Sequence, residues 1–169
     1  MESFNHLSEM EIVQVNNRRD LNQFIKVPWK IYEGNPYWVP PLVKEQEKVL
    51  TPLNPFFEHA EGALFIAKDN STFLGRIAAI VDYNYQNYQQ EKAGAFGFFE
   101  SINDYNVARA LFNCMVNWLK AKKVKVIIGP FNPSTNEECG LLVEGFEKDP
   151  FIMMPYSPVS YTHLRAHET

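Results

Sequence analysis

The stretch ALFIAKDNSTFLGRIAAIVDY, residues 63–83, does most to decide the expected fold of this chain. Apolar residues dominate positions 63–68 and 73–83, and the polar residues 69–72 separate these two runs. Turn-forming residues between two apolar runs are typical of a β-hairpin. The sequence therefore predicts two antiparallel strands joined by a tight turn.

Further elements are predicted on both sides of this hairpin. Before it we expect a strand at 12–15, a helix at 20–31 interrupted by Pro28, a rigid connection at 34–42, a helix at 43–50 and a turn at 54–60. After it we expect an apolar strand at 93–100, an amphipathic helix at 106–122 with Asp104 as N-cap, and a short buried strand at 124–128. This order lacks strict strand–helix alternation, which predicts an α+β fold whose mixed, mostly antiparallel sheet is flanked by helices.

The segment 129–146, GPFNPSTNEECGLLVEGF, follows the last predicted strand and is rich in carboxylate, amide and hydroxyl groups. Pro130, Pro133 and the glycines in it disfavour a long regular element. Polar segments at the ends of buried strands often build the sites of α/β proteins. We therefore expect functional residues in this segment.

Composition excludes several classes of function. A chain of 169 residues allows one domain, and its net charge of -4 without a basic stripe argues against nucleic acid as a main partner. No apolar run is long enough to span a bilayer and no signal peptide is visible, so we expect a cytoplasmic protein. Peripheral contact with a membrane surface is compatible with this composition. Cys114 and Cys139 suit a reducing compartment and are not at metal-ligand spacing, so no metal is expected.

The hairpin, the strand AFGFFE, the amphipathic helix and the segment VKVIIGPFNPSTNEECGLLVEGF together resemble the GNAT superfamily of acyl-CoA N-acyltransferases. More narrowly, the segments NPYWVPPL, NPFFEHAE, GFFE and NPSTNEECGLLVEGF resemble its bacterial ceramide-synthase-like branch. The resemblance implies a GNAT-like fold and transfer of an acyl group from acyl-CoA or acetyl-CoA to a primary amine. It implies a small-molecule amine or a long-chain lipid amine as the acceptor.

The end of the chain carries two expectations. The residues VSYTHLRAHET at 159–169 resemble a translated sequencing adapter, so we expect them to be non-native and expect one domain at 11–158. Tyr161, His163, Arg165 and His167 are accordingly given no functional role. Members of the resembled branch are longer, which implies a fragment truncated at its carboxy terminus, inactive by itself. The apolar stretch 151–156 predicts poor solubility or oligomerisation of the isolated chain.

The resemblance also implies where an acyl-CoA donor binds. The strand 95–100 matches the one whose backbone pairs with the pantetheine arm, so Gly97, Phe98 and Phe99 are the candidate cofactor-binding residues. Gly97 would allow close approach, although an ordinary core strand with one weak position explains it equally well. The following residues 101–106, SINDYN, depart from the resembled pattern, because they lack glycine and carry Asp104, which would repel a diphosphate.

Acyl transfer to an amine benefits from a base that takes a proton from the nitrogen. The candidate catalytic residues are Glu100, Glu137 and Glu138. Glu100 ends the central strand, where the resemblance places bases, and a solvated strand end is the alternative. Glu137 and Glu138 follow Asn136 at an expected helix start, where acidic residues often serve only as dipole and cap partners.

Four polar residues are candidates for substrate binding: His59, Asn132, Ser134 and Asn136. A histidine titrates in a suitable range, but one beside phenylalanines is more often structural. The amide and hydroxyl groups of the other three also supply turn and capping hydrogen bonds. The aromatic residues either line an acyl channel or, as we favour, pack in the core; they are Trp38, Phe56, Phe57, Phe96, Phe98 and Phe99.

Two functions follow from these observations. The first is an N-acyltransferase. The second is a non-catalytic, acyltransferase-like lobe that binds a ligand or packs on a catalytic half, which the missing glycine-rich loop favours.

Overall fold

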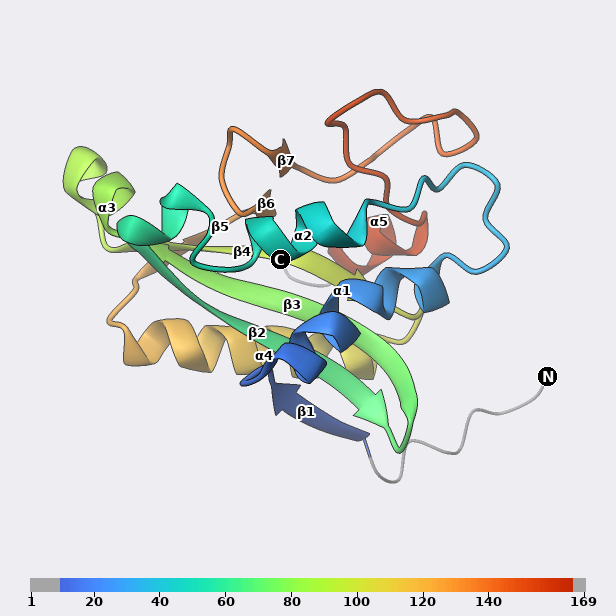
Figure 1. The fold of residues 1–169 in the computed structure, drawn as a ribbon, viewed down its shortest axis with the longest axis horizontal. Helices are drawn as coiled ribbons and strands as arrows, with labels where there is room; N and C mark the ends of the chain where they lie inside the picture. Colours follow the sequence, from blue (N-terminus) through green and yellow to red (C-terminus); the bar gives the residue numbers. More distant parts are fainter. Residues whose placement is uncertain (1–9, 166–169) are drawn as a thin grey trace.

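The structure is a computed structural model that describes residues 10–165, with the backbone alone for 163–165. Its centre is a five-stranded sheet in the order β1-β2-β3-β4-β5 (Figure 1). The strands are β1 (Met10–Gln14), β2 (Ala60–Asp69), β3 (Thr72–Asp82), β4 (Ala93–Ser101) and β5 (Val126–Ile128). The first four pair antiparallel in sequence order, and β5 pairs parallel to β4. The predicted α+β fold with a mixed, mostly antiparallel sheet is confirmed.

Strands β2 and β3 form the predicted hairpin; β2 extends further than the sequence pattern indicated, and β3 begins and ends one residue earlier. Only Asn70 and Ser71 lie between them, since Asp69 pairs with Thr72. Asn70 has a φ of 52°, in the left-handed region that asparagine tolerates better than most residues. This tight turn sets the pairing of Asp69 with Thr72 and of Lys68 with Phe73, and an irregularity between Ala67 and Lys68 shifts the register of the rest of the hairpin.

Helices cover both faces of the sheet (Figure 1). The helices α1 (Arg18–Ile31) and α2 (Val43–Val49) lie on one face, and α4 (Tyr105–Ala121) lies on the other. Strand β3 contributes to both interfaces, with Ile77, Ala79 and Val81 in the cluster under α4 and Ala78 and Ile80 in the cluster under α1. A strand buried on both faces has a nearly continuous apolar sequence, which explains the run in the second half of the hairpin.

Helix α1 continues through Pro28 to Ile31, so the predicted interruption at Pro28 is wrong. Because proline has no backbone N–H, the carbonyl of Phe24, four residues earlier, lacks its helical partner. Nη1 of Arg76 donates a hydrogen bond to this carbonyl at 3.0 Å. A side chain of the sheet thus replaces the hydrogen bond that the helix cannot make.

Helix α4 confirms the predicted amphipathic helix and its N-cap. The side chain of Asp104 accepts a hydrogen bond from the N–H of Asn106 at 2.7 Å. Leu111, Met115 and Leu119 form one stripe that is at most 1% exposed. Burying a side chain of this size contributes about 2 kcal/mol, so this stripe holds the helix on the sheet.

Strand β5 is not buried as predicted. Val126 and Ile127 are 38% and 36% exposed. The strand lies at the edge of the sheet, and no other strand of residues 10–165 pairs with its outer side. Only the residues Ala93–Ala95 of β4 pair with it. A β-branched run indicates a strand but does not say whether neighbours cover it.

The segment 129–146 contains two short strands rather than a helix. These are β6 (Phe131–Asn132) and β7 (Glu138–Cys139), which pair antiparallel. The helix start expected at Asn136 is therefore wrong. Both Gly129–Pro130 and Asn132–Pro133 are cis. A loop leads from β7 to α5 (Ser160–Arg165), and two other short elements, α3 (Tyr83–Gln89) and the 3-10 helix η1 (Pro55–Glu58), were not predicted as helices.

Candidate active site

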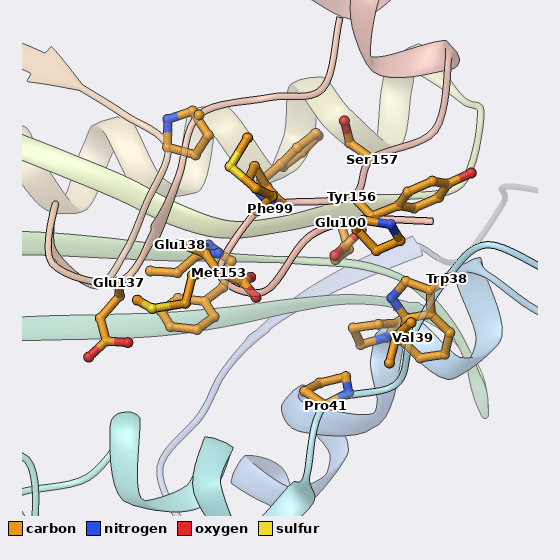
Figure 2. A pocket seen from close by; sticks show the side chains of 18 of the residues that line it. Trp38, Val39, Pro41, Phe99, Glu100, Glu137, Glu138, Met153, Tyr156 and Ser157 are labelled. Carbon is orange, nitrogen blue, oxygen red and sulfur yellow. Dashed lines mark hydrogen bonds between the residues drawn. The ribbon is translucent and has the colours of Figure 1, made fainter. Parts of the chain in front are cut away.

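A cleft of about 390 Å³ opens where β4 ends (Figure 2). Ligand pockets usually have volumes of this order. The loop after α1, the end of β4, the β6–β7 ribbon and the loop at 150–157 all contribute to its walls, so segments far apart in sequence meet there. Apolar side chains and prolines make up much of the lining. The polar lining groups that matter most for the chemistry are Arg76, Glu100, Asn132, Glu137 and Glu138.

A β-bulge in β4 sets the direction of Glu100. The pairing of β3 with β4 shifts between Arg76, opposite Glu100, and Ala78, opposite Gly97, so one residue of β3 faces two of β4. Phe98 lies in this bulge with a φ of 49°. The extra residue reverses the faces on which the following side chains lie. Glu100 consequently points to the face where Arg76 lies.

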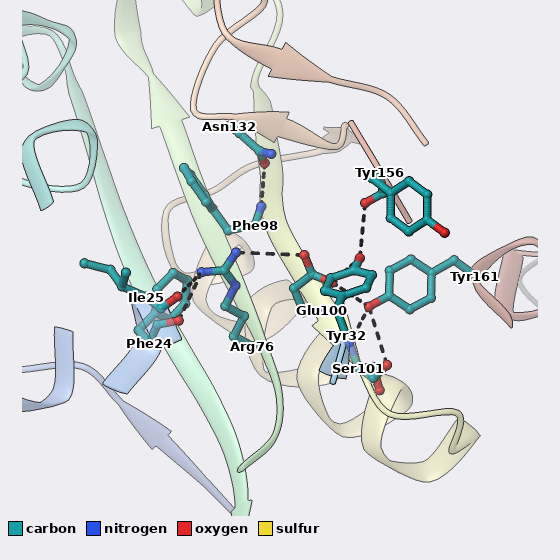
Figure 3. A network of polar contacts seen from close by, with 10 residues as sticks. All are labelled: Phe24, Ile25, Tyr32, Arg76, Phe98, Glu100, Ser101, Asn132, Tyr156 and Tyr161. Atoms are coloured by element: carbon teal, nitrogen blue, oxygen red, sulfur yellow. Dashed lines mark hydrogen bonds and ion pairs between the residues drawn. The ribbon is translucent and has the colours of Figure 1, made fainter. Parts of the chain in front are cut away.

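Glu100 is the most enclosed carboxylate of the cleft, with a side chain that is 13% exposed. Its Oε2 accepts hydrogen bonds from the hydroxyls of Tyr32 and Tyr161, both at 2.8 Å (Figure 3). Its Oε1 lies 3.9 Å from Nη2 of Arg76, an ion pair too long for a direct hydrogen bond. Glu100 is therefore not a solvated strand end.

The surroundings of Glu100 shift its protonation toward neutral pH. Burial raises the pKa of Glu100 from 4.5 to about 7. The charge of Arg76 and the hydrogen bonds from the two tyrosines lower this pKa, whereas the charge of Glu138 raises it slightly. Burial, followed by the charge of Glu100, also raises the pKa of Tyr32 and Tyr161, so both remain hydrogen-bond donors. A carboxyl group with a pKa near 7 exchanges protons readily at neutral pH.

Arg76 is buried in the apolar run of β3, and 5% of it is exposed. Its Nη1 donates to the carbonyls of Phe24 at 3.0 Å and Ile25 at 3.4 Å. The guanidinium lies 5.0 Å from the ring centroid of Phe24 and 5.8 Å from that of Phe98. Burial lowers the pKa of Arg76, and Glu100 opposes this effect. Arginine stays charged in proteins, so Glu100 serves as its counter-charge.

The cleft brings Glu137 and Glu138 into the same cavity as Glu100 (Figure 2). Both side chains are exposed, and neither lies at a helix start, so the alternative role as helix caps is wrong. Partial desolvation by the cleft walls raises the pKa of Glu138, while a hydrogen bond from Asn132 and the charge of Arg76 lower it. These two carboxylates therefore place negative charge near the mouth.

The chain itself occupies the edge of β4 where a donor was expected to pair. A Cβ atom on Gly97 would collide with the carbonyl oxygen of Phe131. The N–H of Phe98 donates to Oδ1 of Asn132 at 2.6 Å. The rings of Phe98 and Phe99 pack in the cores under α1 and α4, respectively. Gly97 thus accommodates the β6 backbone, and a contact of Gly97, Phe98 and Phe99 with acyl-CoA stays a prediction.

Three of the four predicted substrate-binding residues lie away from the cleft, and only Asn132 lines it. Nδ1 of His59 lies 3.0 Å from Oδ1 of Asp82, at the opposite end of the hairpin from its tight turn. Ser134 Oγ accepts a hydrogen bond from the N–H of Asn136 at 3.2 Å, which is a turn contact. Ser134 lines a separate cavity of about 100 Å³. Substrate contact by these residues stays a prediction.

The start of α4 does not fit the diphosphate of a coenzyme A. A phosphate at a helix start is bound by free backbone N–H groups and by the positive end of the dipole. Here the carboxylate of Asp104 already accepts the N–H of Asn106 at 2.7 Å. A second negative group at this place would be repelled, in agreement with the departure seen in the sequence.

Sequence reasoning missed Arg76 and Tyr32, which hold Glu100. A lone arginine in the apolar run FLGRIAAIV was a usable signal, because a buried arginine needs a partner. Tyr161 was given no role, yet its ring is 3% exposed and its hydroxyl contacts Glu100. The non-native origin of 159–169 stays a prediction; the side chains of His163 and Arg165 are not described, and His167 lies outside the described residues.

The fold that holds this cleft is that of the GNAT acetyltransferases. A GNAT-family acetyltransferase from Staphylococcus aureus Mu50 matches with a TM-score of 0.50 and 15% identity, over 73% of this chain and 74% of that chain. An aminoglycoside acetyltransferase from an uncultured soil metagenomic sample, solved with sisomicin, matches with a TM-score of 0.51 and 14% identity, over 70% and 75% of the two chains. At such low identity the likeness shows the fold alone. No family model matches the chain.

Sequence similarity is higher to two curated proteins. The chain is 37% identical over 163 residues to the bacterial ceramide synthase of Caulobacter vibrioides (strain NA1000 / CB15N), covering 95% of this chain and 42% of that protein. It is 37% identical over 145 residues to Protein YghO of Escherichia coli (strain K12), covering 86% and 37%. The chain thus spans about two-fifths of the length of these relatives. The chain has a GNAT-like fold and is similar in sequence to a bacterial ceramide synthase, which confirms the resemblance read from the sequence.

Two further observations concern residues 10–165. No helix there has the length and apolar character needed to cross a membrane. Within the same part of the chain, no group of three or more His, Cys, Asp or Glu residues is placed to hold a metal ion.

Proposed function

We propose that this chain forms part of an N-acyltransferase in which Glu100 takes a proton from the amine acceptor. The observation that carries the proposal is the enclosed carboxyl group of Glu100 at the cleft, with a pKa raised to about 7. The GNAT-like fold and the similarity to a bacterial ceramide synthase support acyl transfer as the reaction class.

The reaction joins the amine nitrogen to the acyl carbon and breaks the bond between that carbon and its sulfur carrier. A primary amine is mostly protonated at neutral pH, because the usual pKa of such a group is about 10. A protonated nitrogen has no lone pair, so it must lose one proton before the attack, and it loses a second proton as the amide forms. One of the two protons is enough to release the sulfur carrier as a thiol, and the other passes to the base and then to solvent. A carboxylate with a pKa near 7 is a suitable acceptor for that proton.

The neighbours of Glu100 suit this role. The hydroxyl of Tyr32 binds Oε2 and fixes the carboxyl group, and in this chain Tyr161, from the segment 159–169, binds Oε2 as well. Oε1 has only the long ion pair with Arg76. We therefore assign proton transfer to Oε1. Glu137 and Glu138 add negative charge around the cleft, which favours a cationic amine over an anionic ligand.

The donor would be acyl-CoA or acetyl-CoA, and the residues proposed to contact it are Gly97, Phe98 and Phe99. Binding at this edge requires Phe131 and Asn132 to move from β4, since they occupy it now. The start of α4 does not fit the diphosphate, so we assign no diphosphate contact to residues 101–106.

A second candidate function is a non-catalytic lobe that binds a ligand or packs on a catalytic half. The occupied edge of β4 and the carboxylate at the start of α4 favour it. For the enzyme, the similarity to a ceramide synthase supports a long-chain lipid amine as acceptor, and a small-molecule amine is the other candidate acceptor.

The test uses the longest natural protein that contains residues 11–158 of this sequence. It is incubated with acyl-CoA donors and a panel of long-chain and small amines, and thiol release is measured. We expect Glu100→Gln to lower kcat by about 10²- to 10⁴-fold, as is usual for the loss of a general base. Glu147→Gln, at an exposed position outside the cleft, is the matched control and should retain full activity.

Each result decides between the two functions. Thiol release that depends on Glu100 supports the enzyme with Glu100 as base. If Glu100→Gln keeps full turnover while Glu137→Gln or Glu138→Gln loses it, the residue whose replacement lowers turnover is the base instead of Glu100. No release with any amine favours the non-catalytic lobe.

A further inference from the structure

Arg76 has more contacts with helix α1 than with the carboxylate it neutralises. Its Nη1 donates to two carbonyls of α1, those of Phe24 and Ile25. Its Nη2 lies 3.9 Å from Glu100, and Nε is buried with no hydrogen-bond partner among the described residues. An arginine this deeply buried, with one donor unsatisfied, is held by its surroundings at a cost in stability.

Pro28 explains why α1 can hold Arg76. In an uninterrupted helix the carbonyl of Phe24 would accept the N–H of residue 28, and an incoming guanidinium would have to compete with that bond. Proline supplies no N–H, so the carbonyl is available to Nη1 of Arg76 at 3.0 Å. Pro28 is itself fully buried within the helix, beside the cleft.

We infer that Arg76 is a positioning residue: the carbonyl of Phe24, left without a helical partner by Pro28, fixes its guanidinium, and the guanidinium holds a positive charge beside the carboxylate of Glu100. Figure 3 shows this chain of contacts from the α1 carbonyls through Arg76 to Glu100. The catalytic consequence rests on the proposed function of Glu100. The effect of Arg76 on the protonation of the Glu100 carboxyl group does not depend on that proposed function.

Four groups face Glu100 from the elements packed around it. Arg76 comes from β3, Tyr32 from the end of α1, Tyr161 from α5 and Glu138 from β7. Among these, Arg76 is the only cation, and the two tyrosines are neutral donors. Charges interact more strongly in a buried site than in water, so the loss of Arg76 should change the titration of Glu100 more than the loss of any other neighbour.

The first experiment titrates Glu100 directly in the 169-residue chain, by NMR of ¹³C-labelled glutamate carboxyl groups, with Glu100→Gln to assign the signal. In Arg76→Met the pKa of Glu100 should rise by about one pH unit or more, because an opposite charge at this range usually lowers it by that amount. In Arg76→Lys the pKa of Glu100 should lie between the values in the unchanged chain and in Arg76→Met. Lysine keeps the positive charge, but its single amino group cannot reach the α1 carbonyls and Glu100 at once as the guanidinium does. Arg109→Lys, at an exposed position on α4, is the control and should change nothing.

A second variant tests the hydrogen bond between Arg76 and the Phe24 carbonyl without altering any charge. Pro28→Ala gives residue 28 an N–H that competes with Arg76 for the Phe24 carbonyl. We expect a more stable helix together with a raised pKa of Glu100. Pro52→Ala, in a loop away from the cleft, should leave that pKa unchanged.

The outcomes separate this inference from the proposed function. An unchanged Glu100 pKa in folded Arg76→Met overturns the positioning role, and an unchanged pKa in Pro28→Ala overturns the role of the hydrogen bond between Arg76 and the Phe24 carbonyl. If Arg76→Met does not fold, Arg76→Lys and Pro28→Ala decide the question. If the pKa shifts as expected while the longest natural protein transfers no acyl group, the proposed function fails and the positioning role stands.

Discussion

At the scale of single residues, Glu100 links the stability of the chain to pH. Its pKa is raised from 4.5 to about 7 in the folded state, so the folded chain holds a proton that the unfolded chain has lost across this window. The stabilisation is full below pH 4.5 and is lost as the pH rises through about 7. The shift corresponds to a free energy on the order of 3 kcal/mol.

We expect the free energy of unfolding of the wild-type chain to be lower at pH 8 than at pH 5, measured by urea denaturation at both values. Glu100→Gln should remove most of this difference, because glutamine does not titrate. Glu147→Gln should show the same difference between pH 5 and pH 8 as the wild-type chain. A pH dependence that is the same in Glu100→Gln and in wild type would contradict the assignment.

Glu100 was predicted at this scale because it ends the expected strand 93–100, where the resemblance places bases; in the structure β4 ends one residue later, at Ser101. The sequence did not predict Arg76 and Tyr32 as partners of Glu100, since these come from a neighbouring strand and a helix end. Their meeting depends on the bulge at Phe98, which plain alternation along β4 does not reveal. His59 lies beside Asp82, at the end of the hairpin away from its tight turn, and its contact with a substrate stays a prediction.

At the scale of elements, the β6–β7 ribbon depends on Gly97. Gly97→Ala would place a Cβ against the carbonyl oxygen of Phe131 and push β6 away from β4. We expect a loss of about 2–3 kcal/mol in the free energy of unfolding, as for other overpacked sites. Thermal or urea unfolding measures it.

The control for this change is Gly62→Ala in β2. A Cβ there meets its nearest atom, the carbonyl oxygen of Ala79, at 3.1 Å, which a small adjustment accommodates. The loss should be clearly smaller than for Gly97→Ala. Equal losses in the two variants would show that contact with β6 is not what requires glycine at position 97.

Helix α4 depends on its first turn. Asp104→Ala removes the acceptor of the Asn106 N–H, and we expect a loss of about 1 kcal/mol in the free energy of unfolding. Asn103→Ala, at the exposed preceding position, is the matched control and should change stability little. If both variants lose the same amount, Asp104 does not act as the cap.

Elements were predictable where the signal is local. The hairpin and α4 carry their own turns, caps and apolar stripes, so the sequence predicted them closely. The course of α1 through Pro28 was not predictable, because Arg76 compensates from β3, far away in sequence. The same holds for β5, whose exposure depends on neighbours that its own residues do not specify.

At the scale of the whole molecule, the loop between β7 and α5 exposes an apolar segment. Phe151 and Ile152 are 84% and 95% exposed, and Met153 and Met154 are more than half exposed. Contiguous exposed apolar residues promote association. We expect the isolated 169-residue chain to self-associate in light scattering.

Replacing Phe151 and Ile152 together by serine should shift the chain toward monomer without lowering its melting temperature, because neither side chain is buried. Leu53→Ser, which removes an apolar side chain that is 76% exposed in a different loop, should leave association unchanged. A wild-type chain that stays monomeric over the same concentration range would contradict this expectation.

The fold class was predictable from the order of elements, and the resemblance placed it among GNAT-like proteins. The cleft itself was only partly predictable. Its carboxylates were found in sequence, but its walls join four segments whose packing no local pattern encodes. The position of the ribbon across the edge of β4 was not visible in the sequence either, because it depends on contacts between Gly97 and Phe131.

The Asn132 side chain also affects whether a strand of another chain can pair with β4. Beyond Ala95, β4 no longer pairs with β5, and an unpaired backbone there would be a template on which a strand from another chain can add. The amide oxygen of Asn132 accepts the Phe98 N–H, and the bulge bends the strand at the same place. Asn132→Ala should therefore make the chain more prone to form intermolecular β-structure, a tendency that thioflavin T fluorescence would detect.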